Sequence, residues 1–339
     1  MPEPATTARD SSAAWDDALR DASYVAGPRV ALTVFLADQL GRPVLVEGPA
    51  GVGKTDLARA VAESLGAPLV RLQCYEGLDA SQVLYEWDYA KQILATQLLR
   101  ERIASETAGG TLEDAVARLE GVESLLFSER YLLERPVLRA LRSETRAVLL
   151  VDEVDRADPS LEAILLEVLA EGQVTVPELG TLRGTTPPFV FLTSNGTREM
   201  TDALRRRCLH LYIDYPPPSI ELDIVKMREP RIEAAMLEHL LAFVQAVRKL
   251  PLRKLPSVGE SIDWARALVV LGSSILDPEL VRDTLGVLIK HDEDRAKVES
   301  KLSALLPEKR LATPDRASGR GANQARLGLT TSRASRSRP

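Results

Sequence analysis

The chain has 339 residues and a formal net charge of −6 at pH 7, and 45% of its residues are hydrophobic. This length and apolar content suffice for two domains with buried cores. The acidic balance argues against a protein that binds nucleic acid, because such a protein needs a basic surface. No run of 18 apolar residues occurs, so no transmembrane segment is expected, and the N-terminus lacks a signal-peptide pattern. Two cysteines are too few for a disulfide framework, which favours a reduced, cytoplasmic protein.

Apolar runs that alternate with amphipathic stretches dominate the chain as far as residue 213. A helical pattern spans residues 11–40, with an interruption at Gly27-Pro28. Strands and helices then follow in turn, with strands expected at residues 44–47, 69–73, 147–151, 189–193 and 209–213, and helices at 57–65, 160–171 and 200–207. This alternation predicts an α/β fold, in which a parallel sheet with right-handed crossovers is flanked by helices.

Composition predicts four segments along the chain. A linker and helix at 1–26 precede an α/β domain at 27–216, which contains a mostly helical insert at about 76–146 and a hairpin at about 173–183. Pro216–Pro218 then punctuates the chain, and an all-helical domain is expected over 217–306, with Ser219 as a candidate N-cap and Glu221 in its first turn. The basic tail at 307–339 is too polar to bury and is expected to be disordered.

A glycine-rich loop follows the first strand and opens a helix. Its eight residues fit G-x-x-x-x-G-K-[ST] and are Gly48, Pro49, Ala50, Gly51, Val52, Gly53, Lys54 and Thr55. Glycines allow several backbone N–H groups to point at one phosphate, and the helix N-terminus adds its positive dipole end. The motif predicts that Lys54 reaches the β- and γ-phosphates of ATP and that the Thr55 hydroxyl binds Mg²⁺. A chance match in a turn is the alternative, but the flanking strand and helix disfavour it.

Two adjacent acids, Asp152 and Glu153, end the apolar strand 147–151. Ligands of open α/β sheets bind at the carboxyl ends of the strands, so Asp152 is predicted to hold Mg²⁺ through water. Glu153 is predicted to polarise the attacking water as a base. Two acids that only cap a strand are the alternative, which the upstream phosphate loop disfavours. A second acid also separates this chain from P-loop kinases of small molecules, whose nucleophile is a substrate hydroxyl.

A polar residue follows the predicted strand 189–193, and three arginines end the predicted helix 200–207. Asn195 closes the strand 189–193 and is predicted to orient water near the γ-phosphate, although an Asn-Gly turn would explain the same residues. Arg205, Arg206 and Arg207 end a short helix, and an arginine inserted from a neighbouring subunit can stabilise charge on a transferring phosphoryl group. Helix periodicity turns these side chains to different faces, so at most two can serve, and a solvated helix end explains the others.

The remaining candidates carry weaker signals. Arg266, in the second domain, is a candidate for contact with the γ-phosphate or a surface arginine. The three histidines show no metal-ligand spacing, and both Cys74 and Cys208 are expected to be small core residues rather than nucleophiles.

The order of these features along the chain resembles that of an AAA+ ATPase. A phosphate loop is followed by two adjacent acids, a polar strand end, an arginine and a helical domain. Residues 150–158, 165–169, 174–180, 193–199 and 203–208 resemble the MoxR branch of that family more specifically. Within the branch, Leu72–Asp79 and Tyr85–Trp87 are similar to the CoxD-type ATPases. The resemblance covers roughly residues 27–290.

The resemblance implies a ring, commonly a hexamer, with ATP at subunit boundaries. It implies that Arg207 is the arginine finger and, less securely because the sequence around 261–264 departs from the family pattern, that Arg266 contacts ATP from the helical lid. It also implies a chaperone or maturation factor, with a von Willebrand factor A partner. The client would be a molybdenum hydroxylase such as carbon monoxide dehydrogenase, whose molybdenum–copper centre CoxD-type members help to mature.

Three functions are compatible with these patterns. The first is an ATP-driven remodeller of a client metalloenzyme. The second is the ATPase subunit of a metal chelatase, which shares the architecture and would insert a metal into a tetrapyrrole. The third is an ATP-dependent assembly switch without turnover. A nucleic-acid motor is disfavoured by charge.

Overall fold

The computed structural model describes residues 10–107, 125–184, 186–273 and 275–306, which belong to one compact unit. Residues 1–9 and the tail from residue 307, for which disorder is predicted, lie outside the described residues. Within the described part of the chain, no helix has the length and apolar character needed to cross a membrane.

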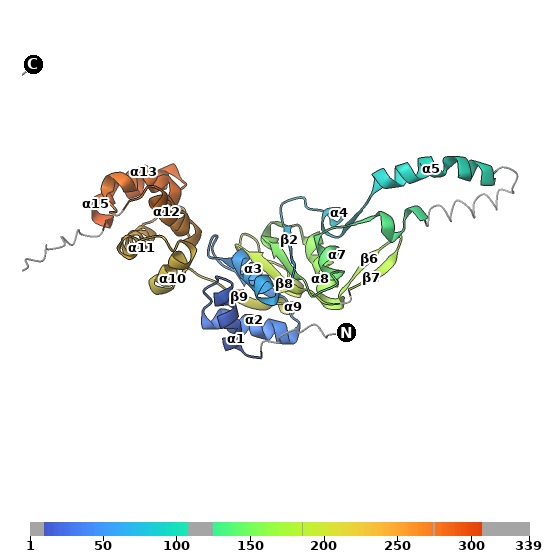
Figure 1. The fold of residues 1–339 in the computed structure, drawn as a ribbon, viewed down its shortest axis with the longest axis horizontal. Coiled ribbons are helices and arrows are strands. Elements are labelled where there is room, and N and C mark those ends of the chain that lie inside the picture. The colour runs from blue at the N-terminus through green and yellow to red at the C-terminus, as the bar shows by residue number, and fades with distance from the viewer. Residues whose placement is uncertain (1–9, 108–124, 185, 274, 307–339) are drawn as a thin grey trace, which may run out of the picture. The chain divides into compact units, whose positions relative to one another are not determined.

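A five-stranded parallel sheet forms the centre of the α/β part (Figure 1). The strand order is β2-β5-β8-β1-β9. The strands are β1 (Val44–Glu47), β2 (Leu69–Gln73), β5 (Val148–Asp152), β8 (Phe189–Ser194) and β9 (Leu209–Tyr212). Neighbours in the sheet are not neighbours in sequence, so the chain crosses over between parallel strands, and the crossovers carry helices. The predicted fold class, a parallel sheet flanked by helices with a helical C-terminal region, is confirmed.

Both faces of the sheet are covered, which explains why the central strands are apolar throughout. Leu149 and Val151 of β5 point to one core, whereas Val148 and Leu150 point to the other. The first core is covered by α7 (Pro136–Leu141), α8 (Pro159–Glu171) and α9 (Asp202–Arg207). The second is covered by α1 (Ser12–Asp21), α2 (Pro28–Leu40) and α3 (Lys54–Leu65).

The segment between β2 and β5 is less uniformly helical than predicted. It contains α4 (Ala80–Val83) and α5 (Tyr89–Thr107), but also two short strands, β3 (Tyr85–Trp87) and β4 (Leu132–Glu134), which pair in antiparallel fashion. Residues 108–124 of this segment are not described. A strand of three residues is too short to show a clear alternation of apolar and polar side chains, so the sequence pattern did not predict these strands. A second hairpin consists of β6 (Gln173–Val176) and β7 (Gly180–Arg183).

Beyond β9 the described chain is helical and has its own core, which includes Phe243 and Trp264. The helices are α10 (Pro218–Arg228), α11 (Ala234–Arg248), α12 (Val258–Val270), α13 (Pro278–Leu288), α14 (Asp292–Ser300) and α15 (Leu302–Leu305). The predicted N-cap at Ser219 is wrong, because α10 begins one residue earlier, at Pro218. Proline suits the first turn of a helix, where its missing N–H has no partner to lose.

A buried ion pair joins three of these helices. The carboxylate of Glu221 in α10 is fully buried and accepts hydrogen bonds from both terminal nitrogens of Arg248 in α11, at 2.6 and 2.8 Å. It also accepts one from Ser261 in α12, at 2.9 Å. Removing one partner of such a pair typically costs about 3–5 kcal/mol, because the other charge remains buried. Arg248 additionally donates to the backbone oxygen of Pro256, so the pair fixes where α12 begins.

Candidate functional site

The glycine-rich loop lies between β1 and α3, and two of its glycines cannot be replaced without a clash. Gly48 has a φ of +150°, and a Cβ there would lie 1.9 Å from the backbone oxygen of Ile213, just after β9. Gly51 has a φ of +74°, and its Cβ would lie 2.3 Å from the Ser257 hydroxyl oxygen at the start of α12. In addition, the N–H of Gly259 donates to the Gly51 oxygen at 3.3 Å. The loop is therefore held by close backbone approach to the end of the sheet and to α12.

The ammonium of Lys54, the first residue of α3, points back into this loop. Its Nζ donates to the backbone oxygens of Gly48 and Pro49, at 2.6 and 2.7 Å, and to Oδ1 of Asn195, at 2.9 Å. Burial lowers the pKa of Lys54, although the nearby acids Asp155 and Asp152 oppose that shift. Three donors and three acceptors match here, so the buried amine is fully hydrogen-bonded.

The Asp152 carboxylate accepts hydrogen bonds from hydroxyl groups of two other elements. Its carboxylate accepts from Thr55 Oγ1 at 3.0 Å and from Thr193 Oγ1 at 2.5 Å, and only 6% of its side chain is exposed. Arg71 of β2 donates to its second oxygen at 2.6 Å. Hydroxyl and carboxylate oxygens are the donors that Mg²⁺ prefers, and a guanidinium already bonded to Asp152 indicates that a positive charge is accepted there. Thr55 and Asp152 thus fit the predicted metal site.

Glu153 follows with a backbone conformation unusual for a residue with a side chain. Its φ is +56°, in the left-handed region, and its N–H donates to Thr193 Oγ1 at 2.9 Å. Non-glycine residues in this region are uncommon and are often found at functional sites. The carboxylate accepts from Gln73 Nε2 at 3.2 Å and pairs with Arg156 at 3.1 Å. The Glu153 carboxylate therefore contacts the last residue of β2 and the short helix that follows β5.

Asn195 is held by a buried acid on the neighbouring loop. Asp155 accepts from the N–H groups of Asn195 and Thr197, at 3.2 and 3.0 Å, and from the Thr197 hydroxyl at 2.6 Å. Burial alone would raise the pKa of Asp155, but these hydrogen bonds outweigh it and hold the pKa below its usual value. The carboxylate therefore stays ionised and fixes the loop that carries Asn195.

A cavity of about 790 Å³ connects these side chains. Nine predicted site residues line it, namely Ala50, Gly51, Val52, Gly53, Lys54, Thr55, Asp152, Glu153 and Asn195. Other lining residues are mostly apolar or backbone groups and include Tyr24, Val25, Val30, Ile213, Tyr215, Ile220, Ile224, Met227, Val258 and Ile262. Its volume is within the usual range for small-molecule sites, about 300–1,000 Å³. A polar part with several charges and an apolar part are thus found in one cavity.

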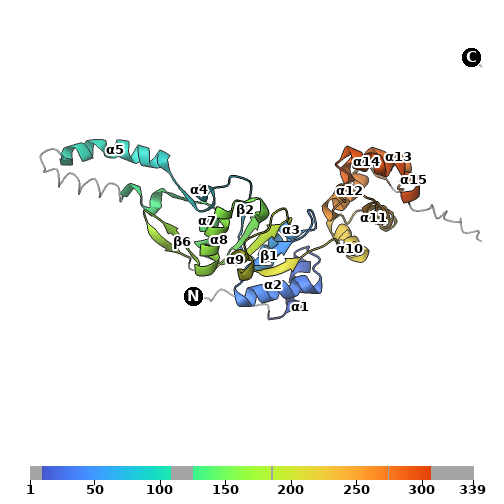
Figure 2. The same cartoon turned by 180° about the vertical axis from the view of Figure 1, so that it is seen from behind.

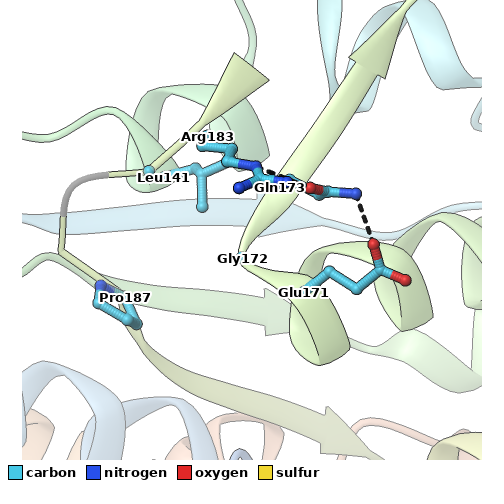
Figure 3. Close-up of a pocket in the computed structure, with 7 residues that line it drawn as sticks. Leu141, Glu171, Gly172, Gln173, Arg183 and Pro187 are labelled. Carbon is cyan, nitrogen blue, oxygen red and sulfur yellow. Dashed lines mark hydrogen bonds between the residues drawn. The ribbon is translucent and has the colours of Figure 1, made fainter. Parts of the chain in front are cut away.

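A second cavity, of about 320 Å³, lies at the base of the β6–β7 hairpin (Figure 3). Its polar side chains hydrogen-bond one another, since Gln173 donates to Glu171 at 2.5 Å and accepts from Arg183 at 3.2 Å. No predicted site residue is among its described lining residues. The larger cavity is therefore the candidate functional site.

The three adjacent arginines of α9 are exposed and do not belong to the described lining of either cavity. Arg205 lies 3.9 Å from Glu47 of its own chain, whereas the Arg207 guanidinium bonds, among the described residues, only the backbone oxygen of Ala203 in α9, at 3.3 Å. Arg42 donates to the backbone oxygens of Arg206 and Arg207, at 2.6 and 3.1 Å. This anchors the end of the helix while leaving the guanidinium of Arg207 on the surface.

Arg266 likewise is not among the described residues that line the cavity. Its side chain is 51% exposed and lies 3.5 Å from Asp263, one turn earlier in α12. Both cysteines are buried, and burial raises the pKa of each thiol to about 12. A thiol with such a pKa is protonated at neutral pH, which makes it a poor nucleophile.

The cavity lining includes charged and polar residues that were not predicted from the sequence, among them Arg71, Gln73 and Arg228. Arg71 and Gln73 alternate with buried residues in β2, and Gln73 is in register with Asp152. The alternation shows that they share one face near the carboxyl end of the strand, which is a signal that can be read from sequence. Arg228 of α10 also lines the cavity and pairs with Asp56 of α3 at 3.1 Å. No local pattern indicates that pairing, because 172 residues separate the partners.

Residues 43–208 match the sequence model of a family described as AAA domain (dynein-related subfamily). That segment begins just before β1, contains the glycine-rich loop and both acids, and ends just after Arg207. Residues 43–208 are an AAA+ ATPase domain. The protein is accordingly an ATP hydrolase of the AAA+ type.

Sequence similarity to other proteins extends beyond this domain. An uncharacterized protein of Staphylococcus saprophyticus is 24% identical over 273 residues, which are 79% of this chain and 90% of the relative. One from Staphylococcus haemolyticus is 25% identical over 272 residues, 78% of this chain and 90% of the relative. Two solved RuvB variants of Thermotoga maritima align with a TM-score of 0.42 each, at 18% and 17% identity, over 81% and 82% of this chain and 78% of theirs. The family match, rather than this distant likeness, carries the identification.

Substitution of Gly51 tests how the loop is held. Gly51→Ala is expected to lower the free energy of unfolding by about 1–2 kcal/mol for the left-handed backbone, and further for the contact with Ser257. Gly66→Ala is the matched control, since Gly66 has a φ of +61° with nothing within 4 Å of its Cβ position. Urea unfolding followed by circular dichroism measures both. The additional Ser257→Gly change should bring Gly51→Ala to the level of the control, and equal losses in the two single variants would contradict the contact.

Proposed function

We propose that this AAA+ chain binds ATP with Mg²⁺ in the 790 Å³ cavity and hydrolyses it there. One observation carries the proposal. Lys54, Thr55, Asp152, Glu153 and Asn195 come from three separate segments of the chain, and all five line the same cavity. A triphosphate needs a cation, a hydroxyl and a carboxylate for its metal, and a base for water, and these groups supply each of them.

Each side chain has a role that follows from its contacts. Among the described residues, Nζ of Lys54 bonds only uncharged backbone and amide oxygens, and it can exchange these for charged phosphate oxygens, to which its hydrogen bonds are stronger. Thr55 and Asp152 hold the metal ion, which when bound neutralises charge that develops on the phosphates. Glu153 accepts a proton from the attacking water, and Asn195 orients that water.

The apolar part of the cavity suits the base of the nucleotide. Tyr24 and Val25 precede α2, Ile213 and Tyr215 follow β9, and Ile262 belongs to α12. Apolar side chains from separate elements can enclose a flat aromatic ring, while backbone groups of these loops supply hydrogen bonds to its edge. A cavity lined both by charged groups at α3 and by apolar side chains of α10, α12 and the loops before α2 and after β9 supports a nucleotide over a free phosphate compound.

The carboxylate of Glu153 can be tested without changing its shape. Glu153→Gln is expected to bind ATP as the parent does but to lose about 10²–10⁴-fold in turnover, the usual contribution of a general base. Glu63→Gln, on the exposed face of α3, is the control with the same chemical change. Phosphate release and equilibrium nucleotide binding measure the two properties. If Glu153→Gln hydrolyses ATP like the parent, Glu153 is not the base.

The chain is proposed to work as a ring, of hexameric size in the resembled family, in which Arg207 completes the site of a neighbouring subunit. This is supported by the exposed guanidinium of Arg207, which has no carboxylate partner among the described residues, and by the AAA+ family itself. Arg205 is a weaker candidate because Glu47 of its own chain lies 3.9 Å away. Arg266 remains a proposed ATP contact that would require α12 to move.

Mixing inactive variants tests whether Arg207 acts between subunits. Lys54→Ala and Arg207→Ala should each lose turnover, by about 10³–10⁵-fold for a finger. In an equal mixture about a quarter of head-to-tail interfaces would pair an intact Lys54 with an intact Arg207, and turnover should recover to that extent. Mixing Lys54→Ala with Glu153→Gln is the control, because both groups act within one subunit. No recovery with Arg207→Ala, together with recovery with Arg206→Ala, would move the finger to Arg206.

The proposed use of this ATP hydrolysis is to remodel a client metalloenzyme, as in the MoxR branch and its CoxD-type members. The similarity of motifs within residues 72–79 and 150–208 to the sequences of that branch supports this proposal. Helix α5, which in Figures 1 and 2 extends beyond the sheet, also supports it, because Tyr89, Ile93, Leu94 and Leu98 are exposed. Exposed apolar side chains gathered on one element suit contact with another protein. The proposed client is a molybdenum hydroxylase of the carbon monoxide dehydrogenase type, with a von Willebrand factor A protein as partner.

Metal content of the client provides the test. A molybdenum hydroxylase is produced together with the von Willebrand factor A protein and either the parent chain or Glu153→Gln, and its molybdenum and copper are measured after purification. The parent is expected to raise the fraction of client with a complete centre, and Glu153→Gln is not. Equal metal content with and without the parent would contradict this function. Metallation of a tetrapyrrole by the parent would instead indicate a chelatase.

A further inference from the structure

Arg71 occupies a position that the proposed mechanism does not use. It lies in β2, the strand beside β5, and its guanidinium donates to Oδ2 of Asp152 at 2.6 Å. The two partners differ in exposure, because the Arg71 side chain is 54% exposed and that of Asp152 only 6%. The carboxylate is therefore fixed in place, whereas the arginine can leave into solvent without breaking packing.

Three side chains already donate hydrogen bonds to the Asp152 carboxylate, and the Thr55 hydroxyl shares its single proton between the two oxygens. Oδ1 accepts from Thr193 at 2.5 Å and from Thr55 at 3.0 Å, and Oδ2 accepts from Arg71 at 2.6 Å and from Thr55 at 3.2 Å. The hydroxyls of Thr55 and Thr193 carry no charge, so Arg71 is the ion-pair partner of this buried carboxylate among the described residues. Charge-assisted hydrogen bonds of this kind are shorter and stronger than neutral ones.

Arg71 also reaches the second acid through one intermediate. The same nitrogen, Nη2, lies 2.6 Å from Oε1 of Gln73, and Nε2 of Gln73 donates to Glu153 at 3.2 Å. Arg71 and Gln73 are two residues apart on one strand and so share a face of the sheet edge. Asp152 and Glu153, the two groups that the proposed reaction needs, are thus joined through Arg71 and Gln73.

We infer that Arg71 is a positioning residue that balances the charge of Asp152 and competes with Mg²⁺ for its carboxylate. This inference rests on the proposed function of the cavity. A divalent cation held by Thr55 and Asp152 places a second positive charge where the guanidinium lies, and like charges at that separation repel. Arg71 must therefore move away from Oδ2 when Mg²⁺ and ATP bind, and its exposed side chain allows it to do so.

The test measures how much Mg²⁺ is needed for nucleotide binding, which does not depend on turnover. Binding of a fluorescent, non-hydrolysable ATP analogue to the full chain is followed as Mg²⁺ is added. Arg71→Met should reach half-saturation at about three- to tenfold lower Mg²⁺, the ratio expected when an ion pair with one buried partner is removed. Arg71→Lys keeps the charge without the planar fork and should lie between Arg71→Met and the parent. Melting temperatures of all variants check that each is folded.

Arg59→Met is the matched control. Arg59 lies on α3, is 44% exposed and pairs with Asp56 at 3.1 Å, so the variant loses one positive charge near the loop without touching Asp152. It should require the same Mg²⁺ as the parent. An equal shift in both variants would mean that general electrostatics, and not competition for Asp152, is responsible, and would overturn the inference.

Two further outcomes separate this inference from the proposed function. If the parent responds to Mg²⁺ and Arg71→Met either responds identically or binds the analogue more weakly at saturating Mg²⁺, the competition is overturned, while the site itself stands. If the parent binds no analogue, or binds it as tightly after Lys54→Ala, the assignment of the cavity is wrong and the inference about Arg71 falls with it.

Discussion

The position of one buried carboxylate, that of Asp152, determines how the site is assembled. It ends a strand that is buried on both faces, and it accepts hydrogen bonds from Thr55 on α3, Thr193 on β8 and Arg71 on β2. A charge this deeply buried is tolerated only when its partners are in place, so the carboxylate constrains three neighbouring elements at once. The glycine-rich loop, the second acid and the polar end of β8 are then fixed relative to one another by the same contacts.

The charged groups of the site form hydrogen bonds within the chain, although Oδ1 of Asp155 has no hydrogen-bond partner among the described residues. Lys54 bonds to loop oxygens and Asn195, Asp155 holds the Asn195 loop, and Arg71 pairs with Asp152. Preorganisation of this kind means that a ligand exchanges partners rather than creating order, which reduces the cost of binding. It also means that each ligand group must offer a better interaction than the internal one it displaces, and a triphosphate with its metal ion does so through charge.

The helices beyond β9 contribute to the same cavity mainly through packing. The charged residue predicted there from the sequence, Arg266, is not among the described lining residues. The buried pair of Glu221 and Arg248 fixes the start of α12, where Ser257 and Gly259 contact Gly51 of the loop. Arg248 also lies 5.0 Å from the ring centre of Tyr215, a lining residue of the cavity. The contacts of Glu221 and Arg248, away from the glycine-rich loop, thus position the part of the cavity lining against which a nucleotide base would lie.

The α/β class, the glycine-rich loop, and the strand ends that carry Asp152, Glu153 and Asn195 could all be predicted from the sequence. This was possible because these features depend on local periodicity and on spacing within single elements. The folded chain was needed to show that Arg71 pairs with Asp152 and that the predicted helical insert contains β3 and β4. It was also needed to show that Arg228 is among the described lining residues of the cavity and that Arg266 is not. Those outcomes depend on contacts between residues distant in sequence, whose geometry is set by packing and leaves no local pattern.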